Sequence, residues 1–142
     1  MATVELRFSA LPAHVRTARL VAAAVARRSG VDEAVLDEVR LAVGEACSRA
    51  VHLHRRYCPE RPVLVVLADD DSAFQVSVAD EAPAGEGDGT SFVELATSSD
   101  VDQEGDPPGV GLAVISGLVD DVAVEAGAER GLTVRMSWAL TS

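Results

Sequence analysis

The stretch that decides the fold is VLDEVRLAVGEACSRA, residues 35–50. Its apolar residues recur three and four positions apart, which places them along one face of an α-helix. They are Val35, Val39, Ala42, Val43, Ala46 and Ala50. Asp32 is a residue type that caps helix starts, so we predict a helix that begins there and reaches His52 to His54. Such a helix buries its apolar face against a second layer of the fold.

The segments on either side of this helix supply the second layer. Alternating or β-branched apolar runs predict five strands, at Thr3–Phe8, Val63–Ala68, Phe74–Val78, Val122–Val124 and Leu132–Ala139. Two more helices are predicted, at Ala13–Ser29, with Pro12 in its first turn and Gly30 at its end, and at Gly109–Leu118. The inner stripe of the first is Ala18, Val21, Ala22 and Val25. The predicted fold is α+β: a two-layer sandwich with three helices on one face of a mostly antiparallel or mixed sheet.

The length and composition of the chain predict a single domain, residues 1–142, whose core is aliphatic. The chain is 48% hydrophobic and only 4% aromatic, and its net charge is −11. That charge repels phosphate backbones and anionic membranes, so we expect neither nucleic-acid nor membrane binding. No arginine lies between Pro62 and Glu129, and the chain has no lysine. We therefore expect the domain to have a basic helical end and an acidic opposite end. Such an uneven charge distribution is suited to binding a partner protein.

Sequence features also predict a cytoplasmic protein. The two cysteines, Cys47 and Cys58, are too few for a disulfide framework. Met1–Ser9 has no apolar core of a signal peptide, and the apolar run Leu20–Ala26 is too short to span a bilayer.

Three places could carry chemistry, and each also has an ordinary structural explanation. Glu45 and Arg49 share a helical face, where such residues commonly form a surface ion pair. Asp80 ends a strand, where its carboxylate could accept a hydrogen bond from a base such as adenine or simply start a turn. Gly109 and Gly111 precede a helix, where free backbone N–H groups can approach an anion or merely form a connection. No metal site is predicted, because the three histidines lack cysteine or carboxylate partners at ligand spacing. No Gly-x-Ser-x-Gly motif or other nucleophile–base pair is visible either.

These places occur in the order and spacing of one known family. The chain resembles the anti-sigma-factor serine kinases of spore-forming and filamentous bacteria, within the GHKL (Bergerat-fold) ATPase superfamily. Five segments carry the resemblance: Leu6–Leu11, Glu45–Ala50 (the E-A-x-x-N-A box), Val78–Glu81, Gly109–Leu112 (the G-x-G-[LF] box) and Gly131–Val134. Together they span nearly the whole chain, and their combination is specific where each segment alone is not.

The resemblance implies a role for each segment. Glu45 would be the general base that activates a serine on a partner, and Asp80 would bind adenine with help from Thr133. Gly109 and Gly111 would line the phosphate site, with residues 81–108 as the ATP lid. Arg19, with Arg16 on the same helix, would contact the partners. Those partners would be a sigma factor and an anti-sigma antagonist of the sulfate-transporter-like (STAS) type, and the family also forms homodimers through the sheet edge and first helix.

Three departures from the family weaken its chemistry here. The Mg²⁺-holding asparagine is Arg49, and a guanidinium, which has donors only, cannot ligate a metal. Arg49 could instead pair with Glu45 and remove the base, or bind phosphate directly. Ala82 and Ala84 replace two glycines, and residues 81–108 contain no basic residue. We therefore predict weak or Mg²⁺-independent binding of ATP or ADP, and little kinase activity.

Three functions follow, of which the first is preferred. It is a protein-binding regulator that holds a sigma factor inactive, and a STAS-type antagonist competes with the sigma factor for binding to it. The alternatives are an active ATP-dependent serine kinase of that antagonist and a nucleotide-sensing module without a sigma partner. All three expect residues 45, 80, 109 and 133 to converge on one cleft.

Overall fold

The computed structural model describes residues 2–82, 115, 117–126 and 131–140, and these form a sheet with two long helices. The elements, in chain order, are β1 (Ala2–Phe8), α1 (Pro12–Ser29), the 3₁₀-helix η1 (Glu33–Val35), α2 (Leu36–Tyr57), β2 (Val63–Asp69), β3 (Ala73–Ala79), β4 (Asp121–Ala126) and β5 (Leu132–Ala139). All five predicted strands are present, with ends within two residues of those expected. The α+β prediction is confirmed.

The five strands form one sheet in the order β1-β2-β3-β5-β4. Each neighbouring pair is antiparallel, so no parallel pair occurs among the described strands. In β3 and β5 the register sets Ala79 opposite Thr133. Asp80 follows β3 at once, and its N–H donates to the carbonyl of Leu132 at 2.9 Å. The sheet therefore places Asp80 beside the start of β5.

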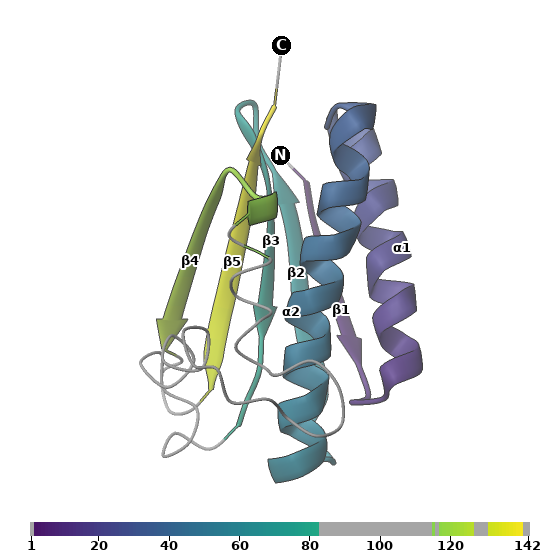
Figure 1. Ribbon diagram of the computed structural model, residues 1–142, viewed down its shortest axis with the longest axis vertical. Coiled ribbons are helices and arrows are strands. Elements are labelled where there is room, and N and C mark those ends of the chain that lie inside the picture. Colours follow the sequence, from purple (N-terminus) through teal and green to yellow (C-terminus); the bar gives the residue numbers. More distant parts are fainter. Residues whose placement is uncertain (1, 83–114, 116, 127–130, 141–142) are drawn as a thin grey trace.

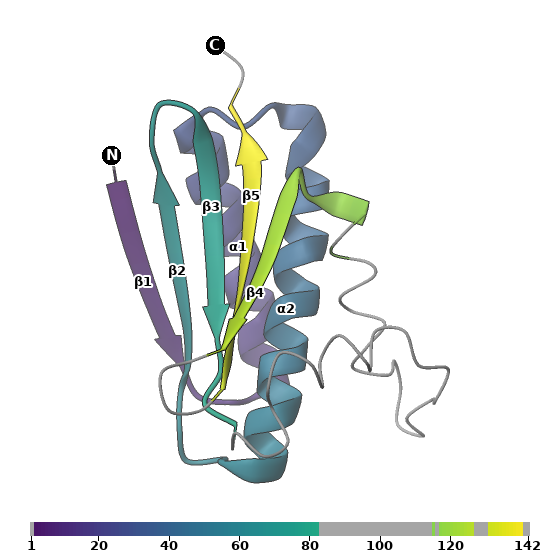
Figure 2. The ribbon, with the colours of Figure 1, turned by 90° about the vertical axis from the view of Figure 1, so that its left-hand side faces the viewer.

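Both long helices cover the same face of the sheet (Figures 1 and 2). The predicted stripe on α2 is buried from Val39 to Ala50, and Val35 is half-buried. On α1 the buried residues are all alanines, namely Ala18, Ala22, Ala23 and Ala26. Val21 and Val25, predicted in that stripe, are only half-buried. Alanines at the contact let α1 lie close to α2, because little side-chain volume separates the helices.

The helix ends differ in part from the prediction. Gly30 ends α1 in the left-handed conformation, with φ of 104°, as expected. Asp32 caps η1 rather than α2, because its side chain accepts from the N–H of Ala34 at 3.0 Å. Helix α2 continues to Tyr57, beyond the predicted end. Most of the predicted third helix, and residues 83–108 of the expected lid, lie outside the described residues; Ile115, Gly117 and Leu118 are helical.

Candidate functional site

A buried ion pair joins α2 to the end of β3. The Nη1 atom of Arg49 donates to Oδ2 of Asp80 at 2.7 Å. The two side chains are only 6% and 0% exposed, so the pair is shielded from water. The surface ion pair considered from the sequence is therefore wrong for Arg49, whose side chain turns inward and reaches the sheet. An arginine here is long enough to cross from the helix to the strand end.

Asp80 is held by backbone groups as well. Its Oδ1 accepts from the N–H of Ala82 at 3.0 Å and from the N–H of Leu132 at 3.4 Å. Gly131, with φ of 81°, packs against the same residue, and a Cβ there would lie 1.9 Å from the carbonyl oxygen of Asp80. Only glycine tolerates both this φ and this approach. The Asp80 carboxylate is thus fixed from α2, from its own turn and from β5.

The next residue, Glu81, is tied to the end of α2. Its N–H donates to Nε2 of His54 at 2.8 Å, while Nδ1 of His54 lies 2.9 Å from the carbonyl oxygen of Arg61. Because a backbone N–H can only donate, Nε2 accepts and the ring proton lies on Nδ1. The Glu81 carboxylate accepts from Arg61 at 2.7 Å. His54 is fully buried, so it serves as a structural clasp between helix and strand end.

Glu45 and Arg19 meet at a small hollow between the helices. This hollow has a volume of about 90 Å³ and is lined by Val15, Arg19, Leu41, Gly44, Glu45 and Ser48. Glu45 is half-buried. The side chain of Arg19 crosses Gly44 so closely that a Cβ there would lie 2.9 Å from Cδ of Arg19. Gly44 therefore lets the exposed Arg19 lie flat on the backbone of α2, next to Glu45.

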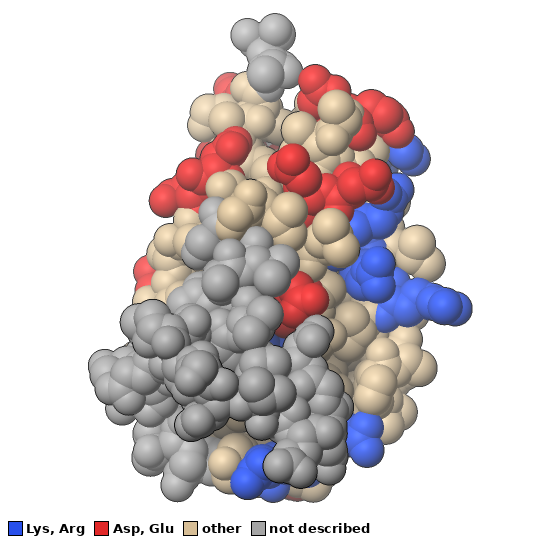
Figure 3. Space-filling view, in the orientation of Figure 1, with Lys and Arg blue, Asp and Glu red and all other residues tan. Residues whose placement is uncertain are grey.

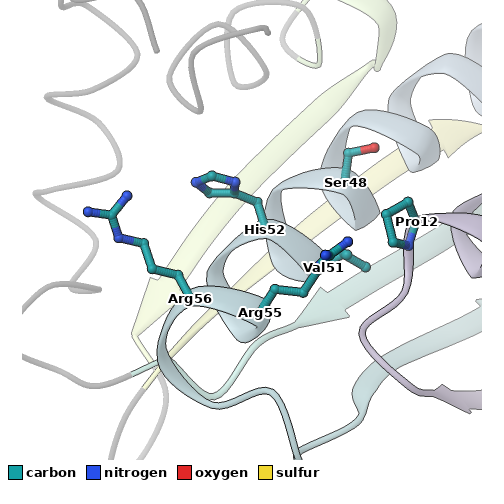
Figure 4. Close-up of a pocket in the computed structure, with 6 residues that line it drawn as sticks. All are labelled: Pro12, Ser48, Val51, His52, Arg55 and Arg56. Carbon is teal, nitrogen blue, oxygen red and sulfur yellow. The ribbon is translucent and has the colours of Figure 1, made fainter. Parts of the chain in front are cut away.

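A larger hollow lies toward the end of α2. Its volume is about 490 Å³, and its lining is Pro12, Ser48, Val51, His52, Arg55 and Arg56. In Figure 4, Arg55 points toward Pro12, whereas Arg56 extends to the other side of the helix. Ser48 lines both hollows, so they adjoin along α2. Sequence reasoning missed this hollow, because only the approach of α1 to α2 creates it.

Charge is divided across this face of the molecule. Figure 3 shows basic side chains gathered over α1 and acidic side chains around the upper ends of the helices. The acids at the start of α2 include Asp37 and Glu38. Within the described residues, no ion pair involves Arg16, Arg19, Arg55 or Arg56, although six other arginines pair with an acid. Basic side chains are therefore present on the α1 side, but acids also lie at the helix ends, so the predicted division into a basic helical end and an acidic opposite end is found only in part.

The residues predicted for the site fall into two groups. Arg49, Asp80 and Thr133 come together at the end of β3, with Thr133 half-buried in β5 opposite Ala79. Glu45 lies one helical turn before Arg49, while Arg16 and Arg19 lie exposed on α1. Gly109 and Gly111 lie outside the described residues. Their roles as base, nucleotide ligands and partner contacts stay predictions.

Two negative findings apply to the described part of the chain only. It contains no group of three His, Cys, Asp or Glu side chains arranged to hold a metal ion. None of its helices is both long and apolar enough to cross a membrane.

Comparison with known proteins agrees with this geometry. The family model for the histidine kinase-like ATPase domain matches residues 8–138. The chain is 29% identical to the serine-protein kinase RsbW of Bacillus subtilis over 141 residues, covering 94% of this chain and 83% of the relative. The RsbW of Bacillus velezensis matches with the same identity and coverage.

Two solved structures share the fold. One contains the RsbU and RsbW domains of Rv1364c from Mycobacterium tuberculosis, with a TM-score of 0.69 and 19% identity. The match covers all of this chain and 33% of that one, so this chain corresponds to about a third of it. The other is the SiaB–SiaC complex of Pseudomonas aeruginosa, with a TM-score of 0.63, 12% identity, and coverage of 96% and 89%. The family model matches residues 8–138, and the fold and the position of Asp80 beside β5 agree with it. This chain therefore belongs to the family of histidine kinase-like ATPase domains, with RsbW-type serine kinases among its relatives.

Proposed function

We propose that this protein is a cytoplasmic regulator that works by binding other proteins through the face formed by α1 and α2. The partners are a sigma factor and a STAS-type antagonist that competes for the same face, as the resemblance to anti-sigma-factor kinases implies. The observation that carries the proposal is a set of exposed arginines that make no ion pair within the described residues. Arg19, Arg55 and Arg56 line two adjoining hollows, and Arg16 lies one turn before Arg19 on α1.

The charge of the whole chain makes these arginines informative. Acids outnumber bases by 23 to 12, so an arginine on this surface has carboxylates available within the same molecule. Arg16, Arg19 and Arg55, together with Arg56 on the other side of α2, nevertheless make no ion pair within the described residues, and the same holds for Arg28 at the far end of α1. A positive face on a negative protein steers an acidic partner to one orientation and repels it elsewhere. The exposed side chains Leu20 (60%) and Leu41 (50%) add apolar area beside Arg19.

Arg19 is the best positioned of the four. Its aliphatic portion rests on Gly44, which restricts the side chain before any partner arrives. Arginine is favoured at interfaces because its planar head can pair with a carboxylate through two hydrogen bonds. Pre-positioning lowers the entropy that is lost when such a contact forms. We therefore assign Arg19 the central contact, with Arg16 and the larger hollow around it.

The proposal is tested by measuring the affinity of candidate sigma factors and STAS proteins from the same genome. Arg19→Ala weakens binding about tenfold or more, since truncating a central interface arginine commonly costs at least that much. Gly44→Ala also weakens binding, because its Cβ displaces the Arg19 side chain, although alanine favours the helix. Arg28→Ala, which removes an exposed arginine near the other end of α1, is the matched control and leaves affinity unchanged. Failure of both partner classes to bind would refute the proposal.

An active serine kinase is the alternative, and it has one specific observation in its favour. Glu45 lines the hollow beside Arg19, where a partner serine would approach. Arg49 opposes this function, because it stands where the family holds its metal-binding asparagine and it pairs with Asp80. Incubation with labelled ATP and the cognate antagonist separates the two functions. Label on the antagonist that Glu45→Gln abolishes would favour the kinase.

A further inference from the structure

The family implies a nucleotide at the end of β3, so we ask whether the residues present there fit one. The group expected to receive the adenine amino group is the Asp80 carboxylate. Its Oδ2 accepts from Arg49 at 2.7 Å, and its Oδ1 accepts from two backbone N–H groups. The side chain of Asp80 is 0% exposed. A base could therefore reach this carboxylate only by displacing the guanidinium of Arg49.

Displacement of Arg49 is opposed by burial on both sides of the pair. The Arg49 side chain is 6% exposed and that of Asp80 is 0% exposed, so separating them would leave the Asp80 carboxylate without its cation in a region shielded from water. An unpaired buried charge is strongly unfavourable. A nucleotide would bring further negative charge but only a neutral base to Asp80, so it would not replace the cation that the carboxylate loses.

The strand end cannot easily move away to open a space. Asp80 donates its own N–H to Leu132 at 2.9 Å, and Gly131 packs directly on its carbonyl oxygen. Glu81 is held through His54 and Arg61. The same short segment is therefore attached to β5 on one side and to α2 and the loop after it on the other.

We infer that Arg49 takes the place of the nucleotide, so that this chain is a member of the ATPase-domain family that works without ATP or ADP. The Arg49–Asp80 pair makes the connection between α2 and the sheet that a bound nucleotide would otherwise make. Partner binding by the α1–α2 face is then independent of the ATP to ADP ratio. The nucleotide part of this inference uses the isolated chain only, so it can fail or hold regardless of which partners exist.

The test is calorimetric titration of the purified protein with ATP and with ADP, with and without Mg²⁺. The wild type gives no binding heat, and millimolar nucleotide raises its Tm by less than about 1 °C, since only a ligand present above its Kd stabilises a fold appreciably. Arg49→Asn removes the guanidinium from Asp80 and restores the family's residue. We expect this variant to give measurable binding heat, with a Kd at least about tenfold below the detection limit of the wild-type titration, because the base gains one hydrogen bond to a charged acceptor.

Two further variants make the result specific. Arg61→Asn breaks the neighbouring ion pair with Glu81, which is 40% and 41% exposed, and leaves Asp80 covered; it does not bind nucleotide. Arg49→Asn combined with Asp80→Ala loses the binding gained by the single change. Where Arg49→Asn does not fold, Arg49→Gln serves, because its neutral amide keeps a donor near Asp80. Any measurable binding of ATP or ADP by the wild type would overturn the inference, and so would absence of binding by every folded Arg49 variant.

Discussion

Removal of the Arg49 guanidinium is the perturbation that most directly examines the buried ion pair. Arg49→Met keeps the aliphatic part of the side chain but leaves the Asp80 carboxylate without its cation. Breaking one partner of a buried pair costs about 3–5 kcal/mol. Asp80 keeps two backbone N–H donors, so the expected loss in the free energy of unfolding is near the lower end, about 3 kcal/mol. For a chain of 142 residues this corresponds to a fall in Tm of about 10 °C.

The assay is urea unfolding followed by the fluorescence of Trp138, the single tryptophan, which is 1% exposed and packs near Phe74. A double-mutant cycle with Asp80→Asn isolates the pair, and we expect a coupling free energy of about 2 kcal/mol. Arg40→Met is the matched control on the same helix, because Arg40 pairs with Asp37, which is 85% exposed. We expect Arg40→Met to lower the free energy of unfolding by less than about 0.5 kcal/mol. A loss for Arg49→Met no larger than that of the control would refute the buried pair.

Three further predictions concern other parts of the molecule. Backbone and side-chain hydrogen bonds from Ser72 and Ala73 lower the pKa of Asp70 below its usual 3.8, so its contribution to stability is present above that pH and is lost as the pH falls through the lowered value. Asp70→Asn therefore unfolds more easily than the wild type at pH 7, and the difference disappears in acid unfolding experiments near pH 2; an equal difference at both pH values would contradict this. Burial raises the pKa of the Cys47 thiol to about 12 and also raises that of Cys58, so neither thiol of the native protein reacts readily with iodoacetamide at pH 8, while both react in urea. Mass spectrometry that finds rapid native modification of either cysteine would show that the thiol is accessible. His54→Phe keeps an aromatic ring but leaves the Glu81 N–H and the Arg61 carbonyl without their partner, and we expect a loss of about 2 kcal/mol in the free energy of unfolding by urea. Tyr57→Phe, a change in an exposed side chain of the same helix, is the comparison, and a loss for His54→Phe no larger than that for Tyr57→Phe would contradict the clasp.

The helices and strands were largely predictable, because their signals are local. The spacing of apolar residues from Val39 to Ala50 depends only on the helical repeat, and alternation in Leu132–Ala139 depends only on the pleat. The predictions were wrong in two places where contacts with neighbouring residues or elements, rather than the local pattern, decide the structure. Asp32 has the side chain of a helix cap, but the turn it closes is η1, since its carboxylate reaches Ala34 before α2 begins. The inner stripe of α1 kept the predicted Ala18 and Ala22, but Ala23 and Ala26 are buried in place of Val21 and Val25, because close contact with α2 favours small side chains.

The candidate site was predictable in that Arg49 and Asp80 lie together, but not in which side chains contact each other. Five short segments identified Arg49 and Asp80 as residues of one site, although 31 positions separate them. Spacing along the helix favoured Glu45 as a partner of Arg49, because sequence shows only which residues share a turn. The true partner of Arg49 is Asp80. This contact depends on the length of the arginine side chain and on the position of α2 relative to the end of β3.

Sequence by itself determined the order of the two long helices and five strands, the aliphatic core, and an arginine at the position where the resemblance leads one to expect a metal-binding asparagine. These are properties of local periodicity and of residue chemistry, and both can be read along the chain. Tertiary structure decided that the arginine points inward to Asp80, that Arg19 rests on Gly44, and that two hollows adjoin between α1 and α2. Each of these depends on the distance between elements remote in sequence, which packing of the helices on the sheet fixes.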